Sequence, residues 1–334
     1  MKWKENLKGS NIIKADDKMK KPLIVLTGPT ASGKTSLAVA LAKKIGGEII
    51  SGDSMQVYKH MDIGTAKVTE DEKEGVPHYM INELDPGEEC SVALFQQKVK
   101  QYMNKIYEKG NIPIIVGGTG FYIRAITHNI EFQEATTKDT TIRDTLMKQA
   151  HEEGPNALYN QLRQVDPISA NKIHKNNIQR VVRALEYYQQ TGEPISTHNE
   201  KEKIRQTPYN LVFFALSMDR GLLYSRIDER VDLMIEKGLV DEVKSLLDQG
   251  YSKNLPSMKG IGYKEFYPYL ENQEDLYSCI DTLKQNTRHY AKRQLTWLRH
   301  QVEPVWIDVD QYNFNKEAIL KILLKEVEQL NLIR

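Results

Sequence analysis

The stretch from Gly28 to Thr35 has the residue types and spacing of a loop that binds phosphate. Two glycines with four residues between them, followed by Lys34 and Thr35, match the pattern in which backbone N–H groups surround phosphate oxygens. In such a loop the lysine adds positive charge, and the threonine hydroxyl can reach a magnesium ion. The candidate loop comprises Gly28, Pro29, Thr30, Ala31, Ser32, Gly33, Lys34 and Thr35.

The residues around this loop supply the strand and helix that such a site needs. The apolar run Leu23–Leu26 precedes it, and the amphipathic stretch Ser36–Lys44 follows it. A helix that begins at the loop directs free N–H groups and the positive end of its dipole at a bound anion. The sequence therefore predicts a phosphate site, without saying which phosphate compound binds there.

Two further apolar runs end in residues that could take part in chemistry. Asp53 follows the run Glu48–Ser51, and Thr119 follows Ile112–Val116 within a glycine-rich turn. Ligands of open α/β sheets bind beyond the carboxyl ends of the strands, so both residues are expected near the phosphate loop. Asp53 could be a general base or a magnesium partner, and equally a turn or cap residue. Thr119 could donate to a phosphate or hold a substrate, or could belong to a simple tight turn.

Arg226 and Arg230 lie one helical turn apart and therefore share a helix face. Guanidinium groups suit diphosphate oxygens because they donate in a planar fork. The alternative is that both arginines pair with acids of the same solvated helix; these acids are Asp228, Glu229 and Asp232.

Two stretches carry several cations and no acid, namely Pro167–Leu185 and Lys284–His300. In the second, Arg288, Lys292 and the adjacent Arg293 lie among aromatic residues, which favours contact with nucleic-acid phosphates. A solvated basic helix face is the alternative.

Strands that alternate with amphipathic helices predict an α/β fold with a parallel sheet and a P-loop NTPase-like core. The fourth apolar run, Leu211–Ser217, resumes the sheet after a helical region without a convincing strand. We expect a polar leader at 1–20, a core at 21–130 and 208–312, a helical insertion domain at 131–207 and a C-terminal helix at 313–334.

The bulk composition excludes several classes of protein. The 334 residues contain two cysteines and carry a net charge of +1, and no long apolar segment predicts a membrane span. The leader lacks the apolar region of a secretory signal. We expect a cytoplasmic enzyme, and nothing in the sequence demands a partner subunit, so a monomer is the simplest interpretation.

Taken together, these strings resemble the tRNA dimethylallyltransferases, also called tRNA isopentenyltransferases. The resemblance covers about Pro22 to Trp306 and is of the bacterial type, because the zinc-finger tail of eukaryotic members has no counterpart here. The matching segments, in the family's order, are Gly28–Thr35, Ser51–Tyr58, Met61–Lys67, Pro113–Tyr122, Gln179–Glu186, Gly260–Tyr263 and Lys292–Arg299.

The resemblance implies transfer of a dimethylallyl group from dimethylallyl diphosphate to N6 of adenosine 37, beside the tRNA anticodon. The phosphate loop would hold the diphosphate, Lys34 and Arg230 would stabilise it with Arg226 beside them, and Thr35 would face Mg²⁺. Asp53 matches the family's general base, and Thr119 matches a residue near donor and acceptor. Contact with the anticodon stem-loop is implied for Asp53, Ser54, Met55, Gln56, Thr119, Arg143, Gln179, Arg180, Val181, Val182 and Arg183, to which the basic helix adds Arg288, Lys292 and Arg293.

Two other functions use the same residues differently. A small-molecule or nucleoside kinase would bind ATP in the loop and use Asp53 as base, but would leave the two basic stretches without a role. A nucleotide-gated RNA-binding switch would leave Asp53 and the glycine-rich turn without a role.

Overall fold

The computed structural model describes residues 20–132 and 141–329, and its internal contacts divide the chain into two compact units. The first unit comprises residues 1–123 and 208–334, and the second comprises residues 124–207. The second unit begins before the expected boundary at 131. The predicted leader lies almost entirely outside the described residues.

The first unit is built on a six-stranded sheet with the order β3-β2-β4-β1-β5-β6, and every strand pair is parallel. The four apolar runs are confirmed as strands and extend by a residue or two. The sheet gains two strands that the sequence did not predict because they are short: β3 has two residues and β6 has four. The strands are β1 (Pro22–Thr27), β2 (Gly47–Ser51), β3 (His78–Tyr79), β4 (Ile112–Gly117), β5 (Asn210–Ser217) and β6 (Val305–Asp308).

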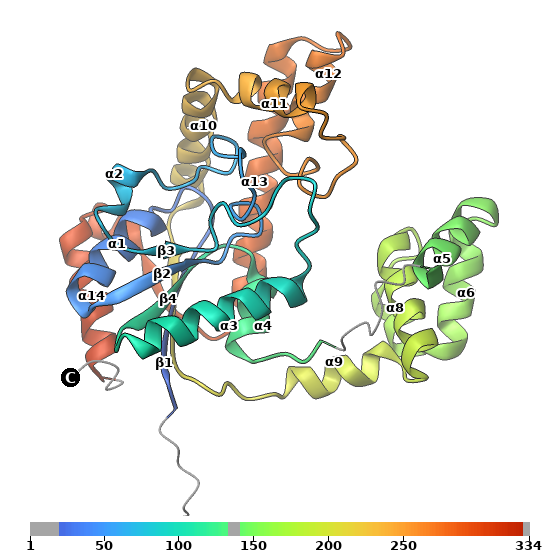
Figure 1. Ribbon diagram of the computed structural model, residues 1–334, viewed down its shortest axis with the longest axis horizontal. Helices are drawn as coiled ribbons and strands as arrows, with labels where there is room; N and C mark the ends of the chain where they lie inside the picture. The colour runs from blue at the N-terminus through green and yellow to red at the C-terminus, as the bar shows by residue number, and fades with distance from the viewer. Residues whose placement is uncertain (1–19, 133–140, 330–334) are drawn as a thin grey trace, which may run out of the picture. The chain divides into compact units, whose positions relative to one another are not determined.

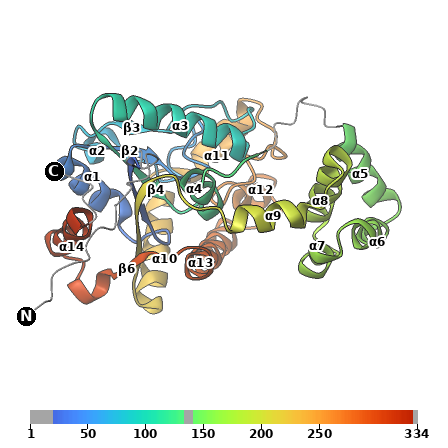
Figure 2. The ribbon, with the colours of Figure 1, turned by 90° about the horizontal axis from the view of Figure 1, so that it is seen from below.

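Helices cover both faces of this sheet. Ile24 and Leu26 of β1 join a buried cluster with Leu41 of α1 and Leu323 of α14, whereas α3 lies on the side of the sheet away from α14 (Figure 2). The helices of this unit are α1 (Lys34–Ile45), α2 (Glu70–Lys73), α3 (Val92–Glu108), α10 (Arg220–Glu236), α11 (Leu239–Asp248), α12 (Tyr267–Leu270), α13 (Leu276–Gln301) and α14 (Lys316–Gln329), while α4 (Gly120–Thr127) runs across the boundary between the units.

The second unit is helical and has its own core. Leu158 and Leu162 of α6 pack against Val182 and Leu185 of α8. Asp166 ends α6 and caps α7 by accepting from the Ser169 N–H at 2.9 Å. The helical character expected for the region 131–207 is confirmed. The helices are α5 (Thr141–Glu152), α6 (Pro155–Val165), α7 (Pro167–Lys172), α8 (Ile178–Thr191) and α9 (Ile195–Lys203).

The long helix α13 lies beside α10 in the first unit (Figure 1). Each begins directly after a capping aspartate: Asp219 accepts from the N–H groups of Gly221 and Leu222, and Asp275 accepts from the N–H of Ser278. Across residues 20–132 and 141–329, none of the helices combines the length and the apolar character needed to cross a membrane.

Candidate active site

Three loops meet at the carboxyl edge of the sheet because their strands are neighbours. β4 lies between β1 and β2, with Thr27 opposite Gly117 and Ser51 opposite Val116. The N–H of Gly52 donates to the carbonyl of Val116 at 2.7 Å, and Thr27 Oγ1 donates to the carbonyl of Gly117 at 2.8 Å. The phosphate loop, the Asp53 turn and the glycine-rich turn therefore start from one rigid platform.

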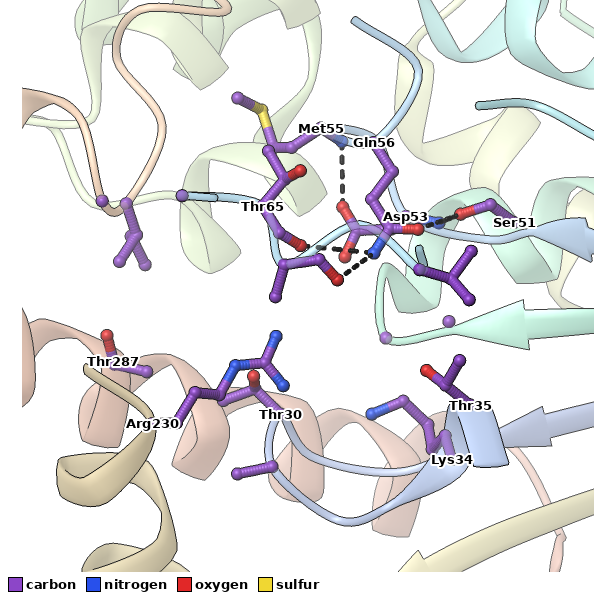
Figure 3. Close-up of a pocket in the computed structure, with 18 of the residues that line it drawn as sticks. Thr30, Lys34, Thr35, Ser51, Asp53, Met55, Gln56, Thr65, Arg230 and Thr287 are labelled. Atoms are coloured by element: carbon purple, nitrogen blue, oxygen red, sulfur yellow. Dashed lines mark hydrogen bonds between the residues drawn. The ribbon is translucent and has the colours of Figure 1, made fainter. Parts of the chain in front are cut away.

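These loops open into a cavity of about 900 Å³ within the first unit. Figure 3 shows Asp53 and Gln56 on one side of this cavity, and Lys34 and Arg230 on the other. A space with an acid on one side and two cations on the other can hold a ligand that carries negative charge at one end. The residues singled out from the sequence that line it are Thr30, Ala31, Ser32, Gly33, Lys34, Thr35, Asp53, Ser54, Met55, Gln56, Arg226, Arg230 and Arg293.

The phosphate loop positions Lys34 at the first residue of α1. Gly33 has a φ of 83°, a left-handed conformation that favours glycine and turns the chain into the helix. Lys34 Nζ donates to the carbonyls of Gly28 and Pro29 at 3.0 and 2.6 Å. Burial, with a smaller contribution from Arg230, lowers the pKa of Lys34 to about 7, while Asp53 acts in the opposite direction. A bound diphosphate would supply the negative charge that keeps this ammonium protonated.

Asp53 lies half-buried on the opposite side of the cavity. Burial raises the pKa of Asp53, while the N–H of Met55 and the charges of Lys34 and Arg230 act to lower it. Its Oδ1 accepts from Met55 N–H at 2.9 Å. A carboxylate with a raised pKa binds a proton more tightly than one with an ordinary pKa, which suits a general base.

Arg226 and Arg230 of α10 do not pair with the acids of their own helix. Asp228 accepts from Arg288 of α13 at 2.5 Å, and Asp232 pairs with Lys284. Arg230 instead lines the cavity, where burial lowers its pKa and the charge of Asp53 opposes that shift. The structure thus favours the ligand-binding interpretation of Arg230 over pairing within the helix.

Arg226 contacts the phosphate loop directly. Its Nε donates to the carbonyl of Ala31 at 3.0 Å, and its guanidinium lies 4.9 Å from the ring centroid of Phe314. Ala31 has a φ of 63°, a backbone conformation that residues other than glycine rarely adopt. The hydrogen bond from Arg226 helps to hold the loop in this conformation.

The glycine-rich turn joins the Asp53 turn through Thr119. Thr119 Oγ1 accepts from the N–H of Ser54 at 3.2 Å, and the N–H of Thr119 donates to the carbonyl of Gly52 at 3.3 Å. Thr119 therefore contacts the residues on both sides of Asp53, namely Gly52 and Ser54, as the neighbouring positions of β2 and β4 require.

Gln294 is a site residue that the sequence analysis missed, although it lies inside the quoted Lys292–Arg299 segment. Its Oε1 accepts from the N–H of Thr30 at 3.0 Å, and its Nε2 donates to the carbonyl of Gly118 at 3.1 Å. The buried amide thus connects α13 to two of the three loops. An amide flanked by basic residues in a helix was the available signal.

The hydroxyl groups of the phosphate loop fit a magnesium ion bound together with a phosphate ligand. Thr35 lines the cavity, and the buried Ser32 Oγ has no hydrogen-bond partner within the described residues. Mg²⁺ prefers hard oxygen ligands and keeps several waters, so it needs few protein groups. In the described part of the chain, no three His, Cys, Asp or Glu side chains gather as a metal-ligand cluster.

The basic helix is less free than its sequence indicated, because the neighbouring helix supplies the acids. The pairs of Arg288 with Asp228 and of Lys284 with Asp232 correct the interpretation of Lys284–His300 as unneutralised. Lys292 and Arg293 are exposed, and the Arg293 guanidinium lies 5.8 Å from the Tyr290 ring centroid.

The second unit presents a similar correction. Glu186, which is 5% exposed, accepts from Arg143 at 3.0 Å and from Arg183 at 2.9 Å. These two arginines therefore share one negative charge, which lies just beyond the acid-free stretch.

Of the other residues proposed for tRNA contact on α8, Gln179 and Arg180 are exposed. Val181 and Val182 are 1% and 2% exposed within the helical core. Because their side chains pack in this core, the predicted contact of these two residues with a tRNA would have to come from their backbone.

Known proteins resemble this chain over most of its length. Residues 56–301 match the family model described as IPP transferase. A tRNA dimethylallyltransferase of Lachnoclostridium phytofermentans is 50% identical over 94% of this chain and 99% of its own length. One from Acetivibrio thermocellus is 48% identical over 89% of this chain and 95% of its own length.

Solved structures agree in fold. The full-length tRNA isopentenylpyrophosphate transferase of Bacillus halodurans superimposes with a TM-score of 0.69 at 44% identity, covering 93% of this chain and 98% of that one. A eukaryotic dimethylallyltransferase acting on tRNA gives a TM-score of 0.79 at 32% identity, covering 93% and 80% of the two chains. By its sequence and its fold, the chain belongs to the IPP transferase family.

Proposed function

We propose that this protein transfers the dimethylallyl group of dimethylallyl diphosphate to N6 of adenosine 37 of a tRNA and releases diphosphate. The observation that carries the proposal is the convergence of Asp53, Lys34 and Arg230 on one cavity. This cavity offers a base and a diphosphate site at once, as prenylation of an amine requires. The names of its relatives point to the same reaction.

The bond changes assign a task to each side of the cavity. N6 attacks the allylic carbon of the donor, the bond between that carbon and the diphosphate oxygen breaks, and its electron pair leaves with diphosphate. The amine proton passes to the Asp53 carboxylate, which prevents positive charge from building up on nitrogen. Lys34, Arg230 and the N–H groups of the phosphate loop stabilise the charge that develops on the leaving diphosphate.

The groups of the phosphate loop also suit a metal ion. We assign the Thr35 hydroxyl as the protein ligand of Mg²⁺, which when bound would neutralise part of the diphosphate charge. The residues named above bind and orient the donor independently of it.

The acceptor has to reach Asp53, which lies half-buried in the cavity lining. A base inside a stacked anticodon loop cannot do so, so adenosine 37 is expected to leave its stack and enter the cavity. Met55, Gln56 and Arg293 line the cavity and are the groups we assign to contact with the tRNA near the reacting base. Exposed Gln179, Arg180 and Lys292 provide further contacts with the anticodon stem-loop.

A kinase would use the same loop for ATP, but membership of the IPP transferase family does not favour it. The test is incubation of the protein with unmodified tRNA and either dimethylallyl diphosphate or ATP, followed by mass spectrometry of the RNA digest. We expect one five-carbon prenyl unit on adenosine with the first donor, and no change with ATP. Phosphate transfer from ATP, or no reaction with dimethylallyl diphosphate, would contradict the proposal.

A further inference from the structure

The carboxylate of Glu242 is enclosed by hydrogen-bond donors from a loop that is distant in sequence. Its Oε2 accepts from the N–H groups of Asp62 at 2.9 Å and Ile63 at 2.8 Å, and its Oε1 accepts from Gly64 N–H at 3.0 Å. Three successive N–H groups directed at one point form an anion-binding nest. Here a side chain of α11 fills the nest, and charge-assisted hydrogen bonds of this kind are stronger than neutral ones.

The Tyr263 side chain closes the nest from the other side. Its hydroxyl donates to Glu242 Oε1 at 2.7 Å, and its fully buried ring lies where a side chain at position 64 would be. A Cβ added to Gly64 would come within 2.6 Å of this ring. The segments Met61–Lys67 and Gly260–Tyr263 therefore meet in one contact, between Gly64 and the Tyr263 ring.

Thr65 and Ala66, which follow Gly64 in the same loop, are hydrogen-bonded to the turn that carries Asp53. Gln56 Nε2 donates to the carbonyls of Thr65 and Ala66 at 3.2 and 3.4 Å. Gln56 Oε1 accepts from Ser51 Oγ at 2.9 Å, at the end of β2. The Gln56 side chain thus spans the turn that carries Asp53, and it depends on the position of the loop carbonyls.

We infer that Glu242 is a positioning residue for Asp53, acting through the loop 62–66 and Gln56. This role rests on the proposed function, because it concerns where the base stands relative to the amine. Among the described residues, Glu242 is not part of the cavity lining, whereas Gly64, Thr65 and Ala66 are. The nest therefore fixes one wall of the cavity from outside it.

Glu242→Gln tests this role with little change in volume. An amide oxygen can accept from some of the four donors, but the amide nitrogen cannot accept at all. We expect the maximal rate of prenyl transfer to fall about 10- to 100-fold, because small displacements of a reacting group cost rates of this order. The KM for dimethylallyl diphosphate is expected to stay within about twofold, since the phosphate loop is not part of this chain of contacts.

Asp241→Asn is the matched control. Asp241 and Glu242 both lie in the first turn of α11, so each substitution removes the same charge from the same helix end. The Asp241 side chain is exposed, and we expect its variant to retain the wild-type rate. Tyr263→Phe is a milder second variant that keeps the ring and removes one donor, and it should lower the maximal rate less than Glu242→Gln.

A readout without turnover separates positioning from general loss of structure. Hydrogen exchange should become faster in peptides covering residues 53–66 of Glu242→Gln, and remain unchanged in the peptide covering 28–35. A rate equal to that of Asp241→Asn, or faster exchange throughout the unit with a higher KM for the donor, would overturn the role of Glu242. A wild-type protein that prenylates no tRNA would overturn the proposed function and this role together.

Discussion

The side-chain amide of Gln294 occupies the space that a side chain at Gly118 would need. A Cβ built on Gly118 would lie 2.0 Å from Gln294 Nε2, which donates to the Gly118 carbonyl at 3.1 Å. The same amide accepts from Thr30 in the phosphate loop. Gln294 of α13 therefore links the phosphate loop to the glycine-rich turn and sets the distance between them.

Gly118→Ala is expected to displace this amide and raise the KM for dimethylallyl diphosphate. If so, Gln294→Ala should create the room that Gly118→Ala lacks, and the two effects should not add. For residues in contact the coupling is about 0.5–3 kcal/mol. Urea unfolding and donor KM values of the two single variants and the double variant measure it. Gly87→Ala is the control: its Cβ would meet the end of the Asp85 side chain at 3.3 Å, and neither residue lines the cavity, so the donor KM should not change. Additive effects of Gly118→Ala and Gln294→Ala would exclude the coupling.

Asp53→Asn should slow prenyl transfer by roughly 10²- to 10⁴-fold and leave tRNA binding intact, because an amide cannot accept the amine proton. Burial raises the pKa of Asp53, so the wild-type rate should fall as the pH drops through this raised value, where the carboxylate becomes protonated. Single-turnover rates over a pH series, with filter binding of tRNA, test both points. An unchanged rate in the variant would remove Asp53 as the base.

Donor binding should take up protons above neutral pH because of Lys34. Its pKa in the free protein is lowered to about 7, mainly by burial, and the negative charge of a bound diphosphate raises it again. Lys34 is thus neutral in the free protein and charged in the complex at pH values above about 7, so affinity should decline as the pH rises through this range. Calorimetry without metal ions, in buffers of different ionisation enthalpy, measures the uptake. The Lys34→Met variant should lose it, and equal proton uptake in both proteins would point to another group.

Part of this architecture was predictable because some signals are local. Buried strands such as β1 need a continuous apolar run, and the phosphate loop needs glycines at fixed spacing, so both could be recognised in the sequence. The strand β6 is short and was missed. The pairing of Arg288 with Asp228 was also missed, since charge balance on one helix depends on a neighbour that the sequence places far away. The same reason hid Glu242.

Binding of tRNA should depend strongly on salt, and two exposed cations should account for part of the slope. If several cations contact phosphates, the slope of log affinity against log salt concentration is expected to be about −3 or steeper. Lys292→Gln and Arg293→Gln should each reduce the slope by about 1. Lys284→Gln is the control: its ammonium already pairs with Asp232 at 2.6 Å, so binding RNA would require breaking that pair, and the slope should change little. A flat salt response of the wild-type protein, or an equal effect of all three substitutions, would show that the exposed face of α13 does not contact the tRNA backbone.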